Sequence, residues 1–452
     1  MEFDLGRQRS YFHSGATRTR EMRLRHLRSL AAAVARRRDE IAAALADDLG
    51  KSAVEAYASE TGFVLRDIEH ACRHLQAWMR PRRVHTPLAA RPGSARIVPE
   101  PLGVVLILSP WNYPLQLALS PLVAALAAGN CAVVKPSEHA PATARLLADI
   151  CSQSFPAELV TVLPGDARLS AELCGMKFDH ILFTGSTAVG RKVAAAAAEN
   201  LVPLTLELGG KSPCVVCEDA DIALAARRIM WGKTMNAGQT CVAPDYVLAH
   251  ESIHSELLDA LADCARSFSS GRDYGRIVNS AHFERLLGLL AGSEIHAGGE
   301  ADADTLTIRP AILKNVGRLS PVMKEEIFGP LLPVLKYSDL SAEIDILVRG
   351  PSPLAAYIFT GDQVKAELFE RRLRCGSICV NDTLTQLFPA DLPFGGVGQS
   401  GYGRYHGRAG FDTFSNLKAV MRRSTRGDSR FRYPPYRITA AVMHRFYRWL
   451  MR

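Results

Sequence analysis

The sequence lacks an uninterrupted apolar run long enough to cross a membrane. A spanning helix needs about 18 such residues, and no stretch of the 452-residue chain reaches that length. The first residues, Met1–Arg7, are mostly polar and contain no apolar segment like that of a secretory signal peptide. We therefore expect a cytoplasmic protein.

The cysteine pattern lacks the features of a disulfide framework or a zinc site. Ten cysteines in a chain of this length, without an export signal, indicate reduced thiols. Cys214 and Cys217 have the spacing of a redox motif, and Cys375 and Cys379 lie four apart. Each pair lies in a β-branched run typical of a strand, and no second CxxC or His cluster follows at zinc spacing. We expect no metal.

The body of the chain also lacks an excess of charge of one sign. The formal net charge is +8, but Lys418–Arg452 contains ten Lys or Arg and one acid. The first 417 residues therefore carry 44 basic and 45 acidic side chains, a net charge of −1. A basic tail on a neutral body gives no reason to expect a nucleic-acid partner.

What the chain does have is the length for two or more domains and an alternating pattern of elements. Residues 18–50 have the apolar spacing of one long helix, which Gly50 ends, and a second helical stretch covers 52–79. From Val104 to Leu206, strand-like runs alternate with helical stretches of ten residues or more. This alternation predicts βαβ units around a parallel sheet, an α/β fold of the nucleotide-binding kind.

Three side chains suited to acyl chemistry follow apolar runs at distant points of the chain. Cys241 ends the turn Gly238–Cys241 and is a candidate nucleophile, although a lone cysteine is more often an inert core residue. Glu207 ends an apolar run just before two glycines and could act as a general base. Asn112 follows the strand-like run Val104–Leu108 and could donate to an oxyanion.

Two further motifs suit a dinucleotide. Gly185–Gly190 is a glycine turn between a strand and a helix, although it departs from the GxGxxG fingerprint. Lys135 and Glu138 follow the short strand-like run 132–134, where charged groups are well placed for ribose hydroxyls. Glu138 favours NAD because a carboxylate repels a 2′-phosphate, while Lys135 favours the phosphate. The two residues therefore favour different cofactors, and the family resemblance given below implies that NAD is preferred and NADP tolerated.

The motifs above, together with Phe183–Ser186, Lys135–Glu138 and Glu325–Pro330, make the chain resemble the aldehyde dehydrogenase superfamily. The resemblance runs from about Phe12 to about Phe414. It is strongest to the class 3 branch of fatty and aromatic aldehyde dehydrogenases. The resemblance implies a Rossmann-like NAD(P)-binding domain (1–80 and 100–207), an α/β catalytic domain (208–395) and a small β oligomerisation arm (81–99 with 396–420). It also implies a homodimer, as is usual in class 3.

The resemblance assigns roles to residues of this chain in three groups. The catalytic residues are Cys241, Glu207 and Asn112. The cofactor-binding residues are Lys135, Glu138, Gly185, Ser186, Gly190, Trp111, Glu326 and Phe328. The residues that line an apolar aldehyde tunnel are Tyr113, Trp231, Met235 and Phe394. Trp231 and Met235 are four apart, which predicts that they share one helix face, although ordinary core packing explains Met235 equally well.

The implied reaction is NAD(P)-dependent oxidation of a hydrophobic aldehyde, medium- or long-chain aliphatic or aromatic, to its carboxylic acid. It would pass through a thiohemiacetal and a thioester on Cys241. Acylating or reductive relatives generally lack a carboxylate at the position of Glu207, so these alternatives are disfavoured. A non-catalytic, membrane-associated protein with the same fold is a further alternative, which the joint presence of the three catalytic residues disfavours.

The basic tail, 421–452, ends in a stretch with helical amphipathicity. In 437–452 the apolar residues Ile438, Val442, Phe446, Trp449 and Leu450 form a stripe, largely apart from Arg437, Arg445, Arg448 and Arg452. Such a helix could bind an anionic membrane surface at the inner face of the membrane. The alternative is that it docks on the protein's own surface or on a partner subunit.

Overall fold

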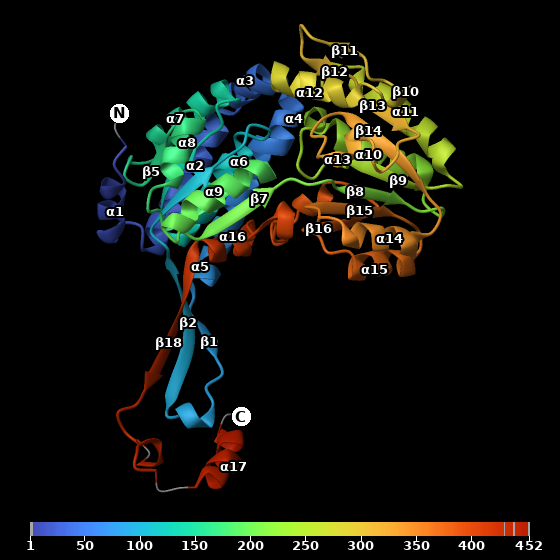
Figure 1. Ribbon diagram of the computed structural model, residues 1–452. Helices are drawn as coiled ribbons and strands as arrows, with labels where there is room; N and C mark the ends of the chain where they lie inside the picture. The colour runs from blue at the N-terminus through green and yellow to red at the C-terminus, as the bar shows by residue number, and fades with distance from the viewer. Residues whose placement is uncertain (1–2, 429, 437–438, 451–452) are drawn as a thin grey trace.

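The computed structural model describes residues 3–428, 430–436 and 439–450, and consists of two lobes and a projecting arm (Figure 1). Each lobe is built around its own sheet, and helices cover the sheets. The chain passes from the first lobe to the second through the four residues between β7 (Leu204–Leu208) and β8 (Pro213–Val216), and it returns after the last strand of the second lobe. Glu207 and Lys211 therefore lie where the chain passes from one lobe to the other.

The first lobe contains a six-stranded sheet in the order β17-β7-β6-β3-β4-β5. Its other strands are β3 (Val104–Leu108), β4 (Cys131–Lys135), β5 (Val160–Val162), β6 (His180–Gly185) and β17 (Gly401–Tyr402). All pairs are parallel except β17 with β7. The covering helices include α6 (Gln116–Ala128), α7 (Pro141–Ser154), α8 (Ala167–Cys174) and α9 (Thr187–Glu199). Every residue of β3 and β4 is buried, which explains their continuous apolar sequence.

The N-terminal helices complete this lobe, and they correct one prediction. They are α1 (Leu5–His13), α2 (Arg20–Arg36), α3 (Arg38–Leu49), α4 (Ala53–Ala56) and α5 (Gly62–Met79), with a π-helical turn at Tyr57–Thr61. The single helix predicted for 18–50 is broken at Arg37, whose φ and ψ are −101° and 21°. Basic residues end α2 and acidic residues begin α3, the charge order that two helix dipoles favour. Gly50 ends α3 in a left-handed conformation, as predicted.

The second lobe contains a seven-stranded sheet in the order β10-β13-β14-β9-β8-β15-β16. Its strands besides β8 are β9 (Tyr246–His250), β10 (Glu294–Ala297), β13 (Ala311–Lys314), β14 (Leu331–Tyr337), β15 (Ala355–Phe359) and β16 (Ser377–Val380). Its helices are α10 (Ile222–Thr234), α11 (His254–Ser269), α12 (Ser280–Leu290), α13 (Pro321–Lys324), α14 (Leu340–Arg349) and α15 (Gln363–Arg372), and a short hairpin joins β11 (Ala301–Asp302) to β12 (Thr307–Ile308). Cys214 lies in β8 and Cys379 in β16, as the strand-like pattern predicted.

The arm is a three-stranded sheet of β1 (Arg82–Val84), β2 (Gly93–Pro101) and β18 (Ser415–Arg423), in the order β1-β2-β18, which extends away from both lobes (Figure 1). The predicted arm segment 396–420 is divided between arm and body. β17 pairs with β7, and α16 (Gly407–Thr413) packs against α6, because Phe411 and Phe414 are buried in the first lobe's core. The arm strand therefore begins at Ser415 and extends three residues beyond 420.

The tail ends in α17 (Ala440–Leu450), close to the short helix Leu88–Ala90 at the tip of the arm (Figure 1). Val442 and Tyr447 are exposed. Of the residues predicted to form the amphipathic stretch, Arg437, Ile438 and Arg452 lie outside the described residues, as do the side chains of Phe446, Arg448, Trp449 and Leu450. Within the part of the chain that the structure describes, no helix has the length and apolar character needed to cross a bilayer.

Candidate active site

A cavity of about 780 Å³ lies between the two lobes. Cys241, Glu207 and Asn112 all line it, although they are far apart in the sequence. Asn112 follows β3, Glu207 lies in β7, and Cys241 follows α10 in the other lobe. The structure thus brings the three predicted catalytic side chains to one space. The ends of parallel strands near a change of connection are a common place for such a site.

The turn before Cys241 has an unusual backbone. Asn236 and Ala237 both have a φ of 51°, and Gly238 has a φ of 75°. A Cβ atom at Gly238 would lie 2.4 Å from the backbone oxygen of Gly329, so only glycine fits there. Left-handed conformation costs a non-glycine residue roughly 1–2 kcal/mol. The strain is concentrated in the turn that presents the cysteine.

The thiol of Cys241 is protonated in this arrangement. Burial, and then the nearby carboxyl groups of Glu326 and Glu207, raise the pKa of Cys241 to about 12, against the opposing effect of two backbone N–H groups. A thiol with so high a pKa is a weak nucleophile at neutral pH. Attack on a substrate therefore requires that the proton leave as the reaction proceeds.

Glu207 is an unpaired carboxyl group inside the protein. The residue is 2% exposed, and neither carboxyl oxygen accepts a hydrogen bond from the described residues. Burial raises the pKa of Glu207 well above its ordinary value. The Arg404 guanidinium and the nearby backbone N–H of Gly396 lower the pKa, although this N–H does not reach hydrogen-bond geometry. A raised pKa brings a carboxyl group closer to the range in which it exchanges protons with water.

Asn112 is buried and held in place. Its Nδ2 atom donates to the backbone oxygen of Gln239 at 3.0 Å. A side-chain amide has two N–H groups, so the second one is left for a group in the cavity that Asn112 lines. The bond to Gln239 ties this amide to the backbone two residues before Cys241.

Another part of the cavity wall has the features of an anion site. Gly185, Ser186, Thr187 and Arg191 line it. Ser186 is the N-cap of α9, and its hydroxyl accepts from the N–H of Val189 at 3.3 Å. The N-terminus of a helix attracts phosphate because its N–H groups and dipole point toward the ligand. This part of the cavity suits a dinucleotide pyrophosphate.

Three of the predicted cofactor residues lie elsewhere. Gly190 packs α9 against β7, since a Cβ atom there would lie 2.6 Å from the Leu208 side chain. Lys135 and Glu138 form an ion pair of 3.0 Å, just past the end of β4. Among the residues described, these three do not line the cavity, so their proposed contacts to a cofactor remain predictions.

Glu326, Phe328 and Trp111 lie at the wall of the cavity. A Cβ atom on Gly209 would lie 1.9 Å from the Glu326 carboxylate, so glycine is needed for this close approach. Burial, and then the charge of Asp245, raises the pKa of Glu326 to about 8. The Trp111 and Phe328 rings meet edge to face, with centroids 5.4 Å apart. This wall offers a carboxyl group and aromatic faces to a ligand.

The sequence did not reveal what positions Glu326. Asp245 accepts a hydrogen bond from the N–H of Ile327 at 2.9 Å and is paired with Lys211. Lys211 also donates to the backbone oxygens of Val322 and Glu325, at 3.0 and 2.9 Å. Lys211 stands four residues after Glu207, directly after the two glycines, and the sequence assigned it no role. Its position in the connection between the lobes was the signal that could have pointed to a structural role for Lys211.

The predicted tunnel residues are not part of this cavity. Among the described residues, Tyr113, Trp231, Met235 and Phe394 are absent from its lining. The Tyr113 hydroxyl is hydrogen-bonded to Thr240 at 2.6 Å. Trp231 and Met235 lie one turn apart at the end of α10, because the N–H of Met235, the C-cap residue, donates to the backbone oxygen of Trp231. Phe394 is stacked on His406, with ring centroids 5.4 Å apart.

Comparison with known proteins identifies relatives along nearly the whole chain. A model of the aldehyde dehydrogenase family matches residues 8–420. The 4,4'-diaponeurosporen-aldehyde dehydrogenase of Staphylococcus aureus is 43% identical over 436 residues, covering 95% of each chain. Aldehyde dehydrogenase family 3 member H1 of Arabidopsis thaliana is 44% identical, covering 95% of this chain and 90% of the relative. The dimeric NADP-preferring aldehyde dehydrogenase of Canis lupus familiaris is 41% identical, covering 95% and 96%.

Solved structures give the same result. The substrate-bound state of Staphylococcus aureus AldH has a TM-score of 0.95 and 42% identity, covering 98% of both chains. An indole-3-acetaldehyde dehydrogenase in complex with NAD+ has a TM-score of 0.85 and 29% identity, covering 93% of this chain and 88% of the other. The predicted fold and the resemblance to class 3 are confirmed. The family match, the identities and the shared fold show that this chain belongs to the aldehyde dehydrogenase family.

Proposed function

We propose that the protein oxidises hydrophobic aldehydes to carboxylic acids, with NAD as the preferred and NADP as a tolerated cofactor. The observation that carries the proposal is that Cys241, Glu207 and Asn112 line one cavity, which the N-terminus of α9 also lines. A nucleophile, a base and an amide donor are what oxidation through a thioester requires. No step of the chemistry needs a residue type that the cavity lacks.

In the first step, the sulfur of Cys241 attacks the aldehyde carbon as its proton passes to water, and the carbonyl oxygen becomes an oxyanion. The free N–H of Asn112 and the backbone N–H of Cys241 would donate to that oxygen. One such donor is worth about 3 kcal/mol of transition-state stabilisation. The product of this step is a thiohemiacetal, which is able to release hydride.

Bound NAD supplies the chemistry of hydride acceptance, which leaves a thioester on Cys241. Glu207 then takes a proton from water, and the oxygen of that water attacks the thioester carbon. The carbon–sulfur bond breaks, the Cys241 sulfur leaves as a thiolate, and the carboxylic acid is released. Because the carboxylate of Glu207 has no hydrogen-bond partner among the described residues, it is available to the water.

The cavity fits such a cofactor in its donor set. Ser186 and the α9 N-terminus would hold the pyrophosphate. Glu326 would accept from ribose hydroxyls, and the close approach of its carboxylate to Gly209 holds it at the wall. Phe328 and Trp111 would contact the nicotinamide face. Lys135 and Glu138 would bind the adenosine ribose. The NAD+ complex of the indole-3-acetaldehyde dehydrogenase supports NAD, and the name of the canine enzyme supports tolerance of NADP.

A hydrophobic aldehyde is the substrate class that we infer. The Staphylococcus aureus relative is named for such an aldehyde. Trp231 and Met235 are half-buried next to the turn that presents Cys241, which supports an apolar approach to the sulfur outside the cofactor cavity. Tyr113 and Phe394 would complete that approach.

The test is NADH formation with purified protein against short aliphatic, long aliphatic and aromatic aldehydes, with Cys241→Ala as the control. We expect turnover that rises with apolar size and is lost in the variant. Added coenzyme A distinguishes an acylating enzyme, which would release an acyl-coenzyme A in place of the acid. Absence of turnover with every aldehyde and both cofactors would contradict the proposal and favour a non-catalytic protein.

We also propose that the protein is a homodimer and that the arm forms part of the interface between the two copies. β18 is an edge strand of the arm sheet, and its Leu417 and Met421 are about half exposed. An exposed strand edge with apolar side chains favours pairing with a second copy. Size measurement in solution before and after Leu417→Lys tests this, and an unchanged monomeric mass in both would contradict it.

For the tail, we propose reversible binding of 437–452 to an anionic membrane surface, peripheral to a cytoplasmic enzyme. The support is the basic composition of the tail and the exposure of Val442 and Tyr447 on α17. The position of α17 near Leu88–Ala90 favours the alternative of docking on the protein. Deletion of 437–452 should reduce binding to phosphatidylserine vesicles, and unchanged binding would contradict the membrane role.

A further inference from the structure

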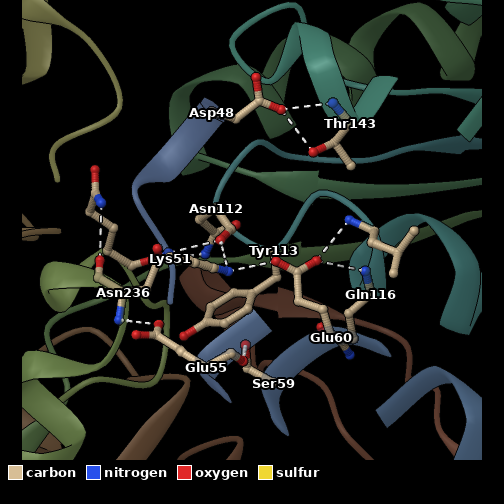
Figure 2. Close-up of polar contacts among 12 residues, drawn as sticks. Asp48, Lys51, Glu55, Ser59, Glu60, Asn112, Tyr113, Gln116, Thr143 and Asn236 are labelled. Carbon is tan, nitrogen blue, oxygen red and sulfur yellow. Dashed lines mark hydrogen bonds and ion pairs between the residues drawn. The ribbon is translucent and has the colours of Figure 1, made fainter. Parts of the chain in front are cut away.

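Three charged side chains from the segment Lys51–Glu60 make polar contacts around Asn112 and Asn236 (Figure 2). The segment includes α4 and the π-helical turn Tyr57–Thr61, and such turns are frequent at functional sites. The side chains of Lys51 and Glu60 are both 0% exposed and are paired at 2.6 Å. Replacing a buried ion pair by apolar residues is often neutral or stabilising. The presence of this pair therefore calls for an explanation other than stability.

Lys51 holds the backbone of the candidate oxyanion residue. Its Nζ atom donates to the backbone oxygen of Asn112 at 3.0 Å (Figure 2). The same atom lies 3.9 Å from the centroid of the Tyr113 ring, in a cation–π contact. One ammonium group thus contacts both Asn112 and the residue after it.

Glu60 holds the other end of the same turn. Its second carboxylate oxygen accepts from the N–H groups of Leu115 and Gln116, at 2.8 and 3.1 Å. These are the first N–H groups of α6, whose own N-cap residue, Leu115, makes no side-chain cap bond. A carboxylate at this place satisfies the free N–H groups and the helix dipole. Lys51 and Glu60 together anchor the backbone on both sides of Tyr113.

Asn236 joins this turn to the cysteine turn. Its Nδ2 atom donates to the backbone oxygens of Asn112 and Gln239, at 2.8 and 3.1 Å. Gln239 is also the acceptor of the Asn112 side chain. The backbone N–H of Asn236 in turn donates to Glu55 at 2.7 Å (Figure 2). The amide of Asn112 is therefore oriented by a network of hydrogen bonds that connects it to Lys51 and Glu55.

We propose that Lys51, Glu60 and Asn236 are positioning residues that set the direction of the Asn112 amide toward the oxyanion. The inference rests on the proposed function, since it assigns to these residues an effect on the oxyanion step. They act through Asn112 and touch neither the substrate nor the reacting sulfur. Their loss therefore slows the reactions that form an oxyanion and leaves a reaction of Cys241 that forms none unchanged.

The experiment compares Lys51→Met and Asn236→Gly with Asn112→Ala and with the double variant Lys51→Met/Asn112→Ala. Methionine keeps the length of Lys51 without its charge, and glycine accepts the positive φ of Asn236. Asp48→Asn is the matched control. Asp48 is a buried acid of the preceding helix that caps α7 through Ala142 and Thr143, away from the cavity (Figure 2).

Each variant is assayed for aldehyde oxidation, for hydrolysis of p-nitrophenyl acetate, and for the rate at which iodoacetamide alkylates Cys241. The first two reactions form an oxyanion and the third does not. We expect Lys51→Met and Asn236→Gly to lower kcat of both oxyanion reactions by about 10- to 100-fold, the range that a misplaced group costs. KM, the alkylation rate and Asp48→Asn activity should stay within about twofold of wild type.

The double variant gives the sharpest result. If Lys51 acts through Asn112, the double variant is no slower than Asn112→Ala alone. Multiplicative losses, equal losses in Asp48→Asn, or a parallel fall in alkylation would overturn the inference. If Lys51→Met does not fold, Asn236→Gly tests the inference by the same comparison of the two oxyanion reactions with the alkylation rate. A wild-type protein that oxidises no aldehyde would reject the proposed function itself, an outcome that differs from active protein with unaffected variants.

Discussion

Replacing Glu207 by glutamine should separate the two halves of the reaction. Glutamine has nearly the same shape, and neither oxygen of Glu207 accepts a hydrogen bond within the described chain, so the change breaks no polar contact there. It removes a charge from a site that is 2% exposed. The folded protein should therefore be at least as stable as wild type, with an unchanged or higher melting temperature.

The catalytic effect should be large in spite of this. A general base contributes typically 10²- to 10⁴-fold, or about 3–5 kcal/mol of transition-state stabilisation. Because Glu207 is needed only for thioester hydrolysis, the first turnover should still release NADH in a burst. The steady-state rate should then fall by that factor, and acyl-enzyme should accumulate on Cys241. Stopped-flow NADH absorbance measures the burst and the steady-state rate, and the intact mass of the quenched protein measures the acyl-enzyme.

The pH dependence has a definite sign. Burial raises the pKa of Glu207 well above that of a free carboxyl, so the basic form appears only as pH rises through this raised value. Hydrolysis should increase with pH over a window above the ordinary pKa, and stability should fall over the same window, since the charged form is disfavoured by burial. Both trends should vanish in Glu207→Gln. Loss of the burst together with the steady state, at an unchanged alkylation rate of Cys241, would refute the assignment.

Three further predictions follow from the geometry of the cavity. Asn112→Ala should lower kcat by about 10²- to 10³-fold with both aldehyde and ester substrates, because it removes one oxyanion donor; an unchanged kcat in steady-state assays would contradict this role. Gly209→Ala should displace the end of the flexible Glu326 side chain, which lies 1.9 Å from the added Cβ atom. We expect NAD to bind about tenfold more weakly, or worse, in a fluorescence titration. An unchanged affinity would contradict this prediction. Glu138→Gln, which breaks the half-exposed pair with Lys135, should lower the NAD-to-NADP ratio of kcat/KM by a factor of about 2–5, and a constant ratio would exclude Glu138 from cofactor choice.

The elements that sequence predicts well here are those whose residues carry a local signal. β3 and β4 are buried on both faces and therefore read as continuous apolar runs. Gly50 ends its helix with the positive φ that glycine allows. Asn112 follows β3 and Glu207 lies near the end of β7, two strands with a clear apolar signal, and both side chains line one cavity with Cys241.

The elements that sequence missed depend on contacts between distant residues. The apolar stretch before Cys241 gives no sign of its irregular backbone, in which the helix ends at Thr234 and Asn236 and Ala237 have positive φ values. The segment 396–420 looked continuous, but Phe411 anchors its middle part in the first lobe. Lys51 and Glu60 are ordinary charged residues in a helical stretch, and only the fold reveals that they are buried behind Asn112.

The site collects features that local rules of stability oppose. Ala237 and Phe328 have positive φ values, Glu207 is buried without a partner, and burial keeps the Cys241 thiol protonated. Nearby, the carboxylate of Glu60 is paired on both oxygens, with Lys51 and with the first N–H groups of α6. In the proposed mechanism, the carboxyl group that exchanges a proton with water has no hydrogen-bond partner among the described residues, while the ion pair that holds the backbone of Asn112 is fully bonded. Such a division favours stabilisation of the transition state over that of the resting protein.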